Sequence, residues 1–224
     1  MNLVLIVKYF FYYGTIDYKY LFEVKFMAFK YILLAVSYLI GAIPFSIIFG
    51  KLFKGIDVRH HGSGNPGGTN SLRFLGVRVG LLIIFGDILK GAIIVILIRA
   101  GVFDDYELFH PLAYSFVAAF GHAYSVFIKF KGGKAVGTTF GGILAFNPWI
   151  ALVVAIVGSI TLKTTKYVSV GSTSIALTFI LCALVIGDYE VLLFATLSAA
   201  LIIFRHQSNY RNIKNKVEPK VKWL

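Results

Sequence analysis

The chain has 224 residues, of which 58% are hydrophobic and 14% charged, and its mean hydropathy is +0.81. Soluble domains carry about 25% charged residues, so this composition excludes an ordinary soluble protein and indicates an all-α helix bundle in a membrane. The formal net charge of +12 at pH 7 fits basic residues in short cytoplasmic loops better than it fits binding to nucleic acid.

Six apolar runs are candidates for membrane spans, because a helix needs about 20 apolar residues to cross about 30 Å of hydrocarbon. The segments between them alternate in charge, and the tail after the last run is strongly basic. The runs cover residues 31–53, 75–98, 108–130, 136–162, 168–186 and 191–204.

The fourth run decides the topology. If residues 136–162 cross once, the basic tail lies on the opposite side of the membrane from the other basic loops. If the run is a hairpin bent at Asn147–Pro148, every basic segment falls on one face, and proline after asparagine favours a turn. We therefore predict seven transmembrane helices, some of them short, with the amino terminus outside and the carboxyl terminus in the cytoplasm.

The first 26 residues do not fit this scheme. Their apolar part is about a dozen residues long, too short for a span, and its aromatic composition is typical of an interfacial segment. Met27 stands directly before the first good span and is a second candidate initiator, so the status of residues 1–26 stays open. Residues 27–224 are predicted to form a single integral membrane domain. The lone Cys182 can form no internal disulfide.

The first polar stretch, residues 60–73, reads HHGSGNPGGTNSLR. Glycine allows the backbone to come close to a ligand, and successive N–H groups can then converge on an anion. Hydroxyl, amide and guanidinium groups nearby would complete a phosphate site. The candidate residues of this stretch are Gly62, Ser63, Gly64, Asn65, Thr69, Asn70 and Arg73.

The second stretch, residues 129–142, reads KFKGGKAVGTTFGG. Gly132 and Gly133 can expose backbone amides, Lys134 supplies a charge, and a predicted helix begins directly afterwards, which together make an anion site. Thr138 is a further candidate contact. The spacing differs from that of a nucleotide-binding Walker motif, so ATP is not predicted. The alternative is a flexible basic turn without a ligand.

The third stretch, residues 205–220, reads RHQSNYRNIKNKVEPK. His206 and Asn209 share a face if the last helix continues through them. The histidine could act as a base, as a cation for phosphate, or as a hydrogen-bonding scaffold. The alternative is a basic segment that only holds lipid headgroups. Glu218, a lone acid among lysines, is expected in a structural ion pair.

Three further polar positions lie within spans. Asp87 and Lys90, three residues apart, are predicted to form a structural ion pair. His122 is interpreted as a core histidine, with a role next to the basic loop left open. His60 and His61 have no matching ligand cluster, so no metal and no cofactor is predicted.

The three stretches resemble, in order, the motifs of the bacterial membrane glycerol-3-phosphate acyltransferases that use acyl phosphate as donor. Residues 62–73 resemble G-S-G-N-x-G-A-T-N-x-x-R, the second stretch resembles a motif ending K-G-G-K-G-V-A-T, and the third resembles H-x-x-N-I-x-R-L-x-x-G-x-E-x-K. The likeness extends from about residue 27 to residue 220. Departures are Gly68 at an alanine position, Ala135 and Lys216 at glycine positions, and Asn212 at an arginine position.

The resemblance implies transfer of a fatty acyl group from acyl phosphate to the 1-hydroxyl of glycerol 3-phosphate, giving lysophosphatidic acid and phosphate in a bacterial cell membrane. Its partners are then these two substrates and membrane lipid, and chain-length preference and oligomeric state stay open. No serine or cysteine nucleophile with an adjacent base is evident, so direct transfer is favoured. We expect Lys134 with the amides of Gly132 and Gly133 to hold one phosphate, and Ser63, Asn65 and Arg73 to orient the other substrate.

Two alternatives accompany this expectation. One is a transporter for a phosphorylated solute, because broken helices with anion-binding amino termini are typical of transporters. The other is a catalytically weakened paralogue, because Ala135, Asn212 and Lys216 depart from the family motifs. The β-carbon of Ala135 could block a positive φ or crowd the donor. The proton acceptor, a substrate phosphate or His206, is also undecided.

Overall fold

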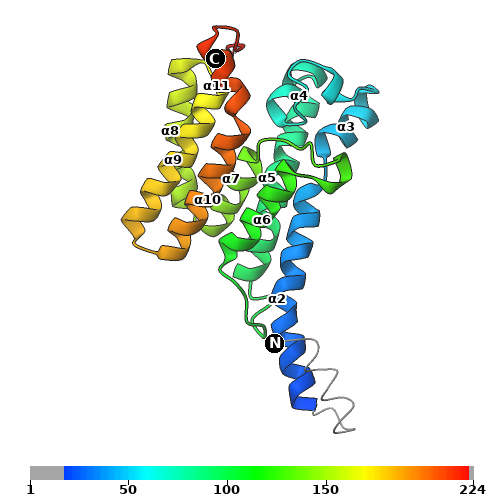
Figure 1. Ribbon diagram of the computed structural model, residues 1–224, viewed down its shortest axis with the longest axis vertical. Helices are drawn as coiled ribbons and strands as arrows, with labels where there is room; N and C mark the ends of the chain where they lie inside the picture. The colour runs from blue at the N-terminus through cyan, green and yellow to red at the C-terminus, as the bar shows by residue number, and fades with distance from the viewer. Residues whose placement is uncertain (1–17, 222–224) are drawn as a thin grey trace.

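The protein is a bundle of helices, and its computed structural model describes the backbone of residues 18–221 and the side chains of residues 28–221 (Figure 1). These residues contain no strand, and two short 3-10 turns, η1 (Val58–His60) and η2 (Val126–Ile128), interrupt the connections. The helices are α2 (Tyr18–Ala42), α3 (Phe45–Lys54), α4 (Gly68–Leu75), α5 (Val77–Arg99), α6 (Pro111–Ala123), α7 (Val136–Phe146), α8 (Pro148–Thr165), α9 (Val168–Ile186), α10 (Tyr189–Arg205) and α11 (Gln207–Lys214).

The predicted apolar runs coincide with these helices. Within the described residues, five stretches are long and apolar enough to cross a membrane, or six when the bent pair α10–α11 counts as one span. The first run is broken at Ile43–Pro44, where α2 ends and α3 begins. Residues 1–17 of the predicted interfacial segment lie outside the described residues. Residues 18–26 belong to α2, which continues through Met27 without a break.

The predicted hairpin in the fourth run is confirmed. Helix α7 ends at Phe146 and α8 begins at Pro148, as a proline at the first helical position favours. The Asn147 side chain caps α8, because its Oδ1 accepts hydrogen bonds from the N–H groups of Trp149, at 3.0 Å, and Ile150, at 3.2 Å. At 1.5 Å per residue, the 11 residues of α7 span only about 16 Å.

Short α7 lies between two groups of helices, with α2, α5 and α6 on one side and α8, α9 and α10 on the other (Figure 1). Its backbone touches that of α5, since a Cβ built on Gly91 would lie 1.8 Å from the carbonyl oxygen of Thr138. Small residues at such crossings are typical of helix packing in membranes. On its other side, Ile143 packs with Val154, Phe179 and neighbouring residues of α8–α10.

The ionic residues predicted inside the second span are paired. Asp87 Oδ1 lies 2.9 Å from Lys90 Nζ and 3.4 Å from His122 Nδ1, and all three side chains are buried. Lys90 also donates to the carbonyl oxygen of Ile43, at 3.1 Å, at the break between α2 and α3. The cluster thus ties α5, α6 and the α2–α3 break together, and the buried charges of Asp87 and Lys90 neutralise each other.

The polar stretches gather at one end of the bundle. Helices α4 and α11 lie at the upper end of Figure 1, whereas the α9–α10 connection, with Asp188, lies at the lower end. This arrangement brings segments more than 130 residues apart in the chain to the same end of the molecule, as the hairpin topology predicts.

Candidate active site

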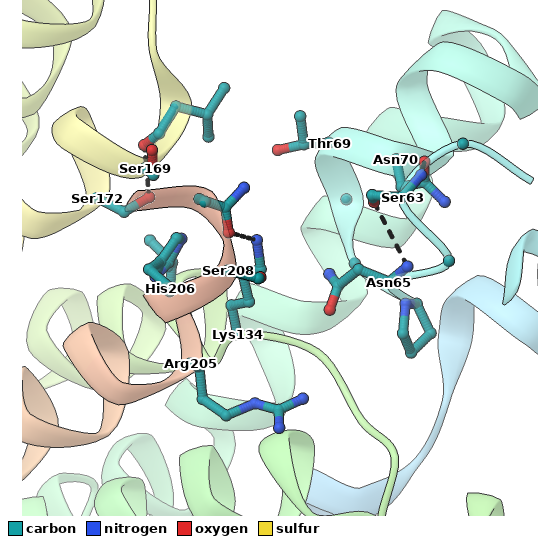
Figure 2. Close-up of a pocket in the computed structure, with 18 of the residues that line it drawn as sticks. Ser63, Asn65, Thr69, Asn70, Lys134, Ser169, Ser172, Arg205, His206 and Ser208 are labelled. Atoms are coloured by element: carbon teal, nitrogen blue, oxygen red, sulfur yellow. Dashed lines mark hydrogen bonds between the residues drawn. The ribbon is translucent and has the colours of Figure 1, made fainter. Parts of the chain in front are cut away.

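A cavity of about 990 Å³ opens among α4, α7, α9 and α11, and all three polar stretches line it (Figure 2). Convergent polar groups in a cleft are the ordinary signature of a binding site. The cavity contains most of the predicted site residues: Gly62, Ser63, Gly64, Asn65, Thr69, Asn70, Arg73, Gly132, Lys134, His206, Asn209 and Glu218.

Asn70 organises the first loop rather than facing a substrate, which corrects the prediction for this residue. Its Oδ1 accepts from the N–H of Ser63 at 3.3 Å, and its Nδ2 donates to the carbonyl oxygens of Val58 and His61 at 3.1 and 3.0 Å. Both amide protons are therefore used, and the side chain is only 4% exposed. The loop needs glycine at Gly62 and Gly64, whose φ values are 58° and 68°.

The loop leads into α4 in a geometry suited to an anion. Gly67, the residue before α4, provides no side-chain cap, so N–H groups of the first turn have no intrahelical partner. Thr69 and Asn65 line the cavity at this end of the helix, and Ser63 Oγ accepts from the N–H of Asn65 at 3.4 Å. Exposed Arg73 reaches the cavity from the last turn of α4.

The glycine pair of the second stretch does not offer its amides to a ligand, contrary to the prediction. The N–H of Gly132 donates to the carbonyl oxygen of Ala123 at 3.1 Å, and that of Gly133 donates to His122 O at 3.0 Å. A Cβ on Gly132 would lie 2.0 Å from His122 O, and one on Gly133 would lie 2.1 Å from His122 Nε2. These glycines are therefore required by close packing against the end of α6 and not by phosphate.

Lys134 is held in the cavity by a chain of polar groups. Its ammonium group donates to Asn209 Oδ1, and Asn209 Nδ2 donates to Glu218 Oε1 at 2.6 Å. Glu218, expected in an ion pair, instead accepts from two amides, since Asn212 Nδ2 lies 3.2 Å from its Oε2. Burial lowers the pKa of Lys134 to about 8; Glu218 opposes this shift, and nearby Arg205 and Arg73 add to it. The predicted helix follows, because α7 begins at Val136.

His206 lies just beyond the end of α10 and is 2% exposed. Its Nδ1 lies 2.8 Å from the carbonyl oxygen of Ile202, which can only accept, so Nδ1 carries the proton and Nε2 is left as an acceptor. Burial, together with the positive charge of Lys134, lowers the pKa of His206 to about 4. The imidazole is therefore neutral at pH 7, which removes the role of a cation for phosphate and leaves those of base or scaffold.

The prediction for Thr138 is also corrected, because this residue does not line the cavity. It is fully buried in α7 at the crossing with Gly91 of α5, and its Oγ1 has no hydrogen-bond partner among the described residues. The helical turn after Val136 directs this position into the bundle, so Thr138 contributes to helix packing and not to binding.

The sequence did not predict that residues of α9 line one side of the cavity. Val168, Ser169 and Ser172 line the cavity, and Ser169 Oγ is buried without a hydrogen-bond partner in the described part of the chain. Tyr167, which precedes α9, makes no side-chain cap. Figure 2 shows Ser169 and Ser172 on the side of the cavity opposite Ser63 and Asn65. A serine-rich helix start was the only signal, and serines are common in membrane helices.

The departures from the family motifs preserve a left-handed backbone. Ala135 has φ 62° and Lys216 has φ 59°, at the two positions where the motifs have glycine. The β-carbon of Ala135 therefore does not block a positive φ, because the alanine itself adopts one. Asn212, at the arginine position, donates to Glu218.

We expect Ala135→Gly to leave both stability and turnover nearly unchanged. Glycine relieves a left-handed strain of about 1–2 kcal/mol. It also removes a buried methyl group worth about 0.8 kcal/mol and adds unfolded-state freedom of about 0.4–1 kcal/mol. Thermal unfolding and steady-state rates check this expectation. A tenfold rise in turnover would instead show that the β-carbon obstructs the donor.

The model of the family described as "Glycerol-3-phosphate acyltransferase" matches residues 31–216. The chain belongs to this family. The glycerol-3-phosphate acyltransferase of Bacillus subtilis strain 168 is 44% identical over 193 residues, covering 86% of this chain and 98% of the relative. That of Bacillus cytotoxicus is 42% identical over 195 residues, covering 87% and 96%. The chain is therefore an acyltransferase of lipid biosynthesis, and the transporter alternative is wrong.

Solved structures of the family share the fold. The crystal structure of PlsY, an integral membrane glycerol 3-phosphate acyltransferase, in its glycerol 3-phosphate form aligns with a TM-score of 0.77 at 34% identity, covering 86% of this chain and 95% of PlsY. The lysophosphatidic acid form of PlsY aligns with a TM-score of 0.74 at 35% identity, covering 85% and 94%. The multi-pass helical fold is thus common to this chain and to PlsY.

Proposed function

We propose that this acyltransferase takes its acyl group from a fatty acyl phosphate and passes it to the 1-hydroxyl of glycerol 3-phosphate, releasing lysophosphatidic acid and inorganic phosphate. One observation carries the proposal: a single cavity lies between two helix amino termini without side-chain caps, α4 and α9, with Lys134 and Arg73 as cations. Such a cavity has the charge and the room for two phosphate groups. PlsY, the structural relative, has been seen in glycerol 3-phosphate and lysophosphatidic acid forms.

In the proposed reaction, the 1-hydroxyl oxygen attacks the acyl carbonyl carbon, the bond from that carbon to the phosphate oxygen breaks, and phosphate leaves with the electron pair. The hydroxyl proton passes to a phosphate oxygen of a substrate or to Nε2 of His206. Lys134, Arg73 and the two helix ends offset the repulsion between the two phosphates and align them. Alignment of this kind can lower a barrier by about 7–11 kcal/mol.

Direct transfer is supported by the serines of the cavity. Ser63 Oγ accepts from a backbone N–H, Ser172 donates to the carbonyl oxygen of Val168, and no side-chain base bonds Ser169 or Ser208 within the described residues. None of them resembles an activated nucleophile. We expect intersecting initial-rate lines for the two substrates, and no label on the protein after incubation with labelled acyl phosphate alone. Parallel lines with a labelled chain would establish an acyl-enzyme instead.

The pKa of Lys134 predicts a pH dependence. The ammonium form binds anions, and its pKa of about 8 means that the free enzyme loses this charge as the pH rises through 8. We expect kcat/KM for glycerol 3-phosphate to fall above pH 8, and the fall to disappear in Lys134→Arg, because arginine stays charged. Rates from pH 6.5 to 10, each scaled to the plateau of its own variant, test this expectation. A wild-type profile that is flat to pH 10 contradicts it.

We further propose that the cavity faces the cytoplasm of a bacterial cell. Exposed lysines surround its end of the bundle, as the positive-inside rule predicts for cytoplasmic loops. In a Cys182→Ser background, Lys54→Cys, Lys131→Cys and Lys214→Cys should react with an impermeant maleimide only after the membrane is opened. Tyr189→Cys, at the opposite end and 87% exposed in the wild type, should react in intact cells. The reverse pattern would place the cavity outside.

A further inference from the structure

We propose that Arg205 is a positioning residue for Lys134, holding the backbone that leads into this lysine by two hydrogen bonds to consecutive glycine carbonyls. The inference rests on the proposed role of Lys134 in binding substrate phosphate. It concerns the last residue of α10, which lies 71 positions further along the chain and binds the carbonyl groups of the glycine pair.

The contacts account for every backbone polar group of the glycine pair. Arg205 Nε donates to Gly133 O at 3.0 Å, and Nη2 donates to Gly132 O at 2.8 Å. The N–H groups of the same two glycines donate to carbonyl oxygens at the end of α6. The pair is thus bonded on both sides, and it is buried. Figure 2 shows the Arg205 side chain extending below Lys134, away from Ser63 and Thr69.

The chemistry of this contact suits arginine. Two adjacent carbonyl oxygens need two donors at a fixed separation, and a planar guanidinium provides them, whereas an ammonium group is a single point charge on a flexible stem. The guanidinium carbon also lies 5.3 Å from the ring centroid of Tyr124, a cation–π contact that helps to hold the guanidinium in place.

The backbone is therefore held in place on both sides of Lys134. The bonded glycine pair precedes it, and Ala135, held in a left-handed conformation and 1% exposed, follows it. Loss of Arg205 leaves two buried carbonyl oxygens without partners, so the segment must shift to reach water or new donors. A displacement of about 1 Å at a catalytic group can cost about 100-fold in rate.

Arg205 also acts through its charge. The charged and titratable groups that face the Lys134 ammonium are Arg205 from α10, Arg73 from α4, Glu218 from the tail, and His206 at the α10–α11 bend. Because Arg205 is positive, its removal favours the ammonium form of Lys134. Geometry and charge can therefore be separated by two substitutions at the same position.

The test compares Arg205→Lys and Arg205→Gln with Arg211→Gln, an exposed arginine on α11 outside the cavity. We expect Arg205→Lys to lower kcat about tenfold and to keep the wild-type pH profile. Arg205→Gln should lower kcat about 100-fold and move the alkaline limb of kcat/KM to higher pH. Arg211→Gln should stay within twofold of wild type. Size-exclusion profiles and thermal unfolding show which variants are folded. If Arg205→Gln does not fold, the kcat of Arg205→Lys decides the test.

Folded Arg205→Lys with wild-type kcat would overturn the positioning role. The positioning role would also be overturned if the Arg205 variants only gave less folded protein, while the folded fraction kept the wild-type kcat and pH profile. Lys134→Met separates this failure from that of the proposed function. If Lys134→Met is inactive while the Arg205 variants are normal, only the positioning inference fails. If Lys134→Met is active, the site assignment itself is wrong.

Discussion

Lys134→Met should lower turnover by about 100-fold or more. The substitution keeps an unbranched side chain but removes the cation that lies between the uncapped ends of α4 and α9. Removal of one preorganised donor from a developing or bound charge typically costs 10²- to 10³-fold in rate. Steady-state kinetics of the purified, folded variant measure the effect.

Lys163→Met is the matched control, because Lys163 is exposed in the last turn of α8 and does not line the cavity. It should retain wild-type turnover. Activity of Lys134→Met within threefold of that control would show that the phosphates are bound elsewhere.

Gly133→Ala should abolish activity and lower stability together. Its Cβ would lie 2.1 Å from His122 Nε2, and the histidine cannot move aside without breaking its contact to Asp87. Overpacking of this kind typically costs about 1–3 kcal/mol, and the displaced backbone carries Lys134 with it. Thermal unfolding and turnover of the same preparation measure both effects.

Gly137→Ala, four residues later, is the control for the stability of Gly133→Ala. The nearest heavy atom to its added Cβ is Asp87 Cβ at 3.4 Å, an ordinary contact, and the position is helical. Its unfolding temperature should match or exceed that of the wild type, because alanine favours the helix. An unfolding temperature of Gly133→Ala equal to that of Gly137→Ala would contradict the close-packing role of the glycine pair.

Local patterns predicted the features that depend on neighbours in sequence. The hairpin follows from Asn147–Pro148, which combines a cap and a helix start in two residues. The ion pair of Asp87 and Lys90 follows from their spacing on one helix and the cost of an unpaired charge in a membrane. The gathering of three polar stretches at one cavity follows from the topology, once the hairpin is fixed.

Features that depend on distant partners were mispredicted or missed. The sequence of Gly132 and Gly133 suits an anion loop, but the carbonyl groups that occupy their amides belong to α6, about ten residues earlier. Asn70 has the side chain of a substrate-binding residue, but this side chain bonds instead to the backbone of Val58, His61 and Ser63. The serines of α9 enter the cavity through packing of α9 beside α10, which no short motif encodes.

The site also shows how this chain tolerates its altered motifs. Ala135 and Lys216 keep the left-handed backbone expected of glycine, and Asn212 bonds to the carboxylate of Glu218 in place of a charged partner. The chain from Glu218 through Asn209 to Lys134 is intact. The backbone conformation and the contacts of Lys134 are therefore kept despite the altered motifs.

The most direct test supplies purified protein with glycerol 3-phosphate and one acyl donor at a time, and measures lysophosphatidic acid and inorganic phosphate in the same reaction. The proposed transfer from acyl phosphate predicts that this donor yields both products in equal amounts, while acyl-CoA and acyl carrier protein yield neither. Formation of lysophosphatidic acid from either thioester donor, with none from acyl phosphate, would contradict the account.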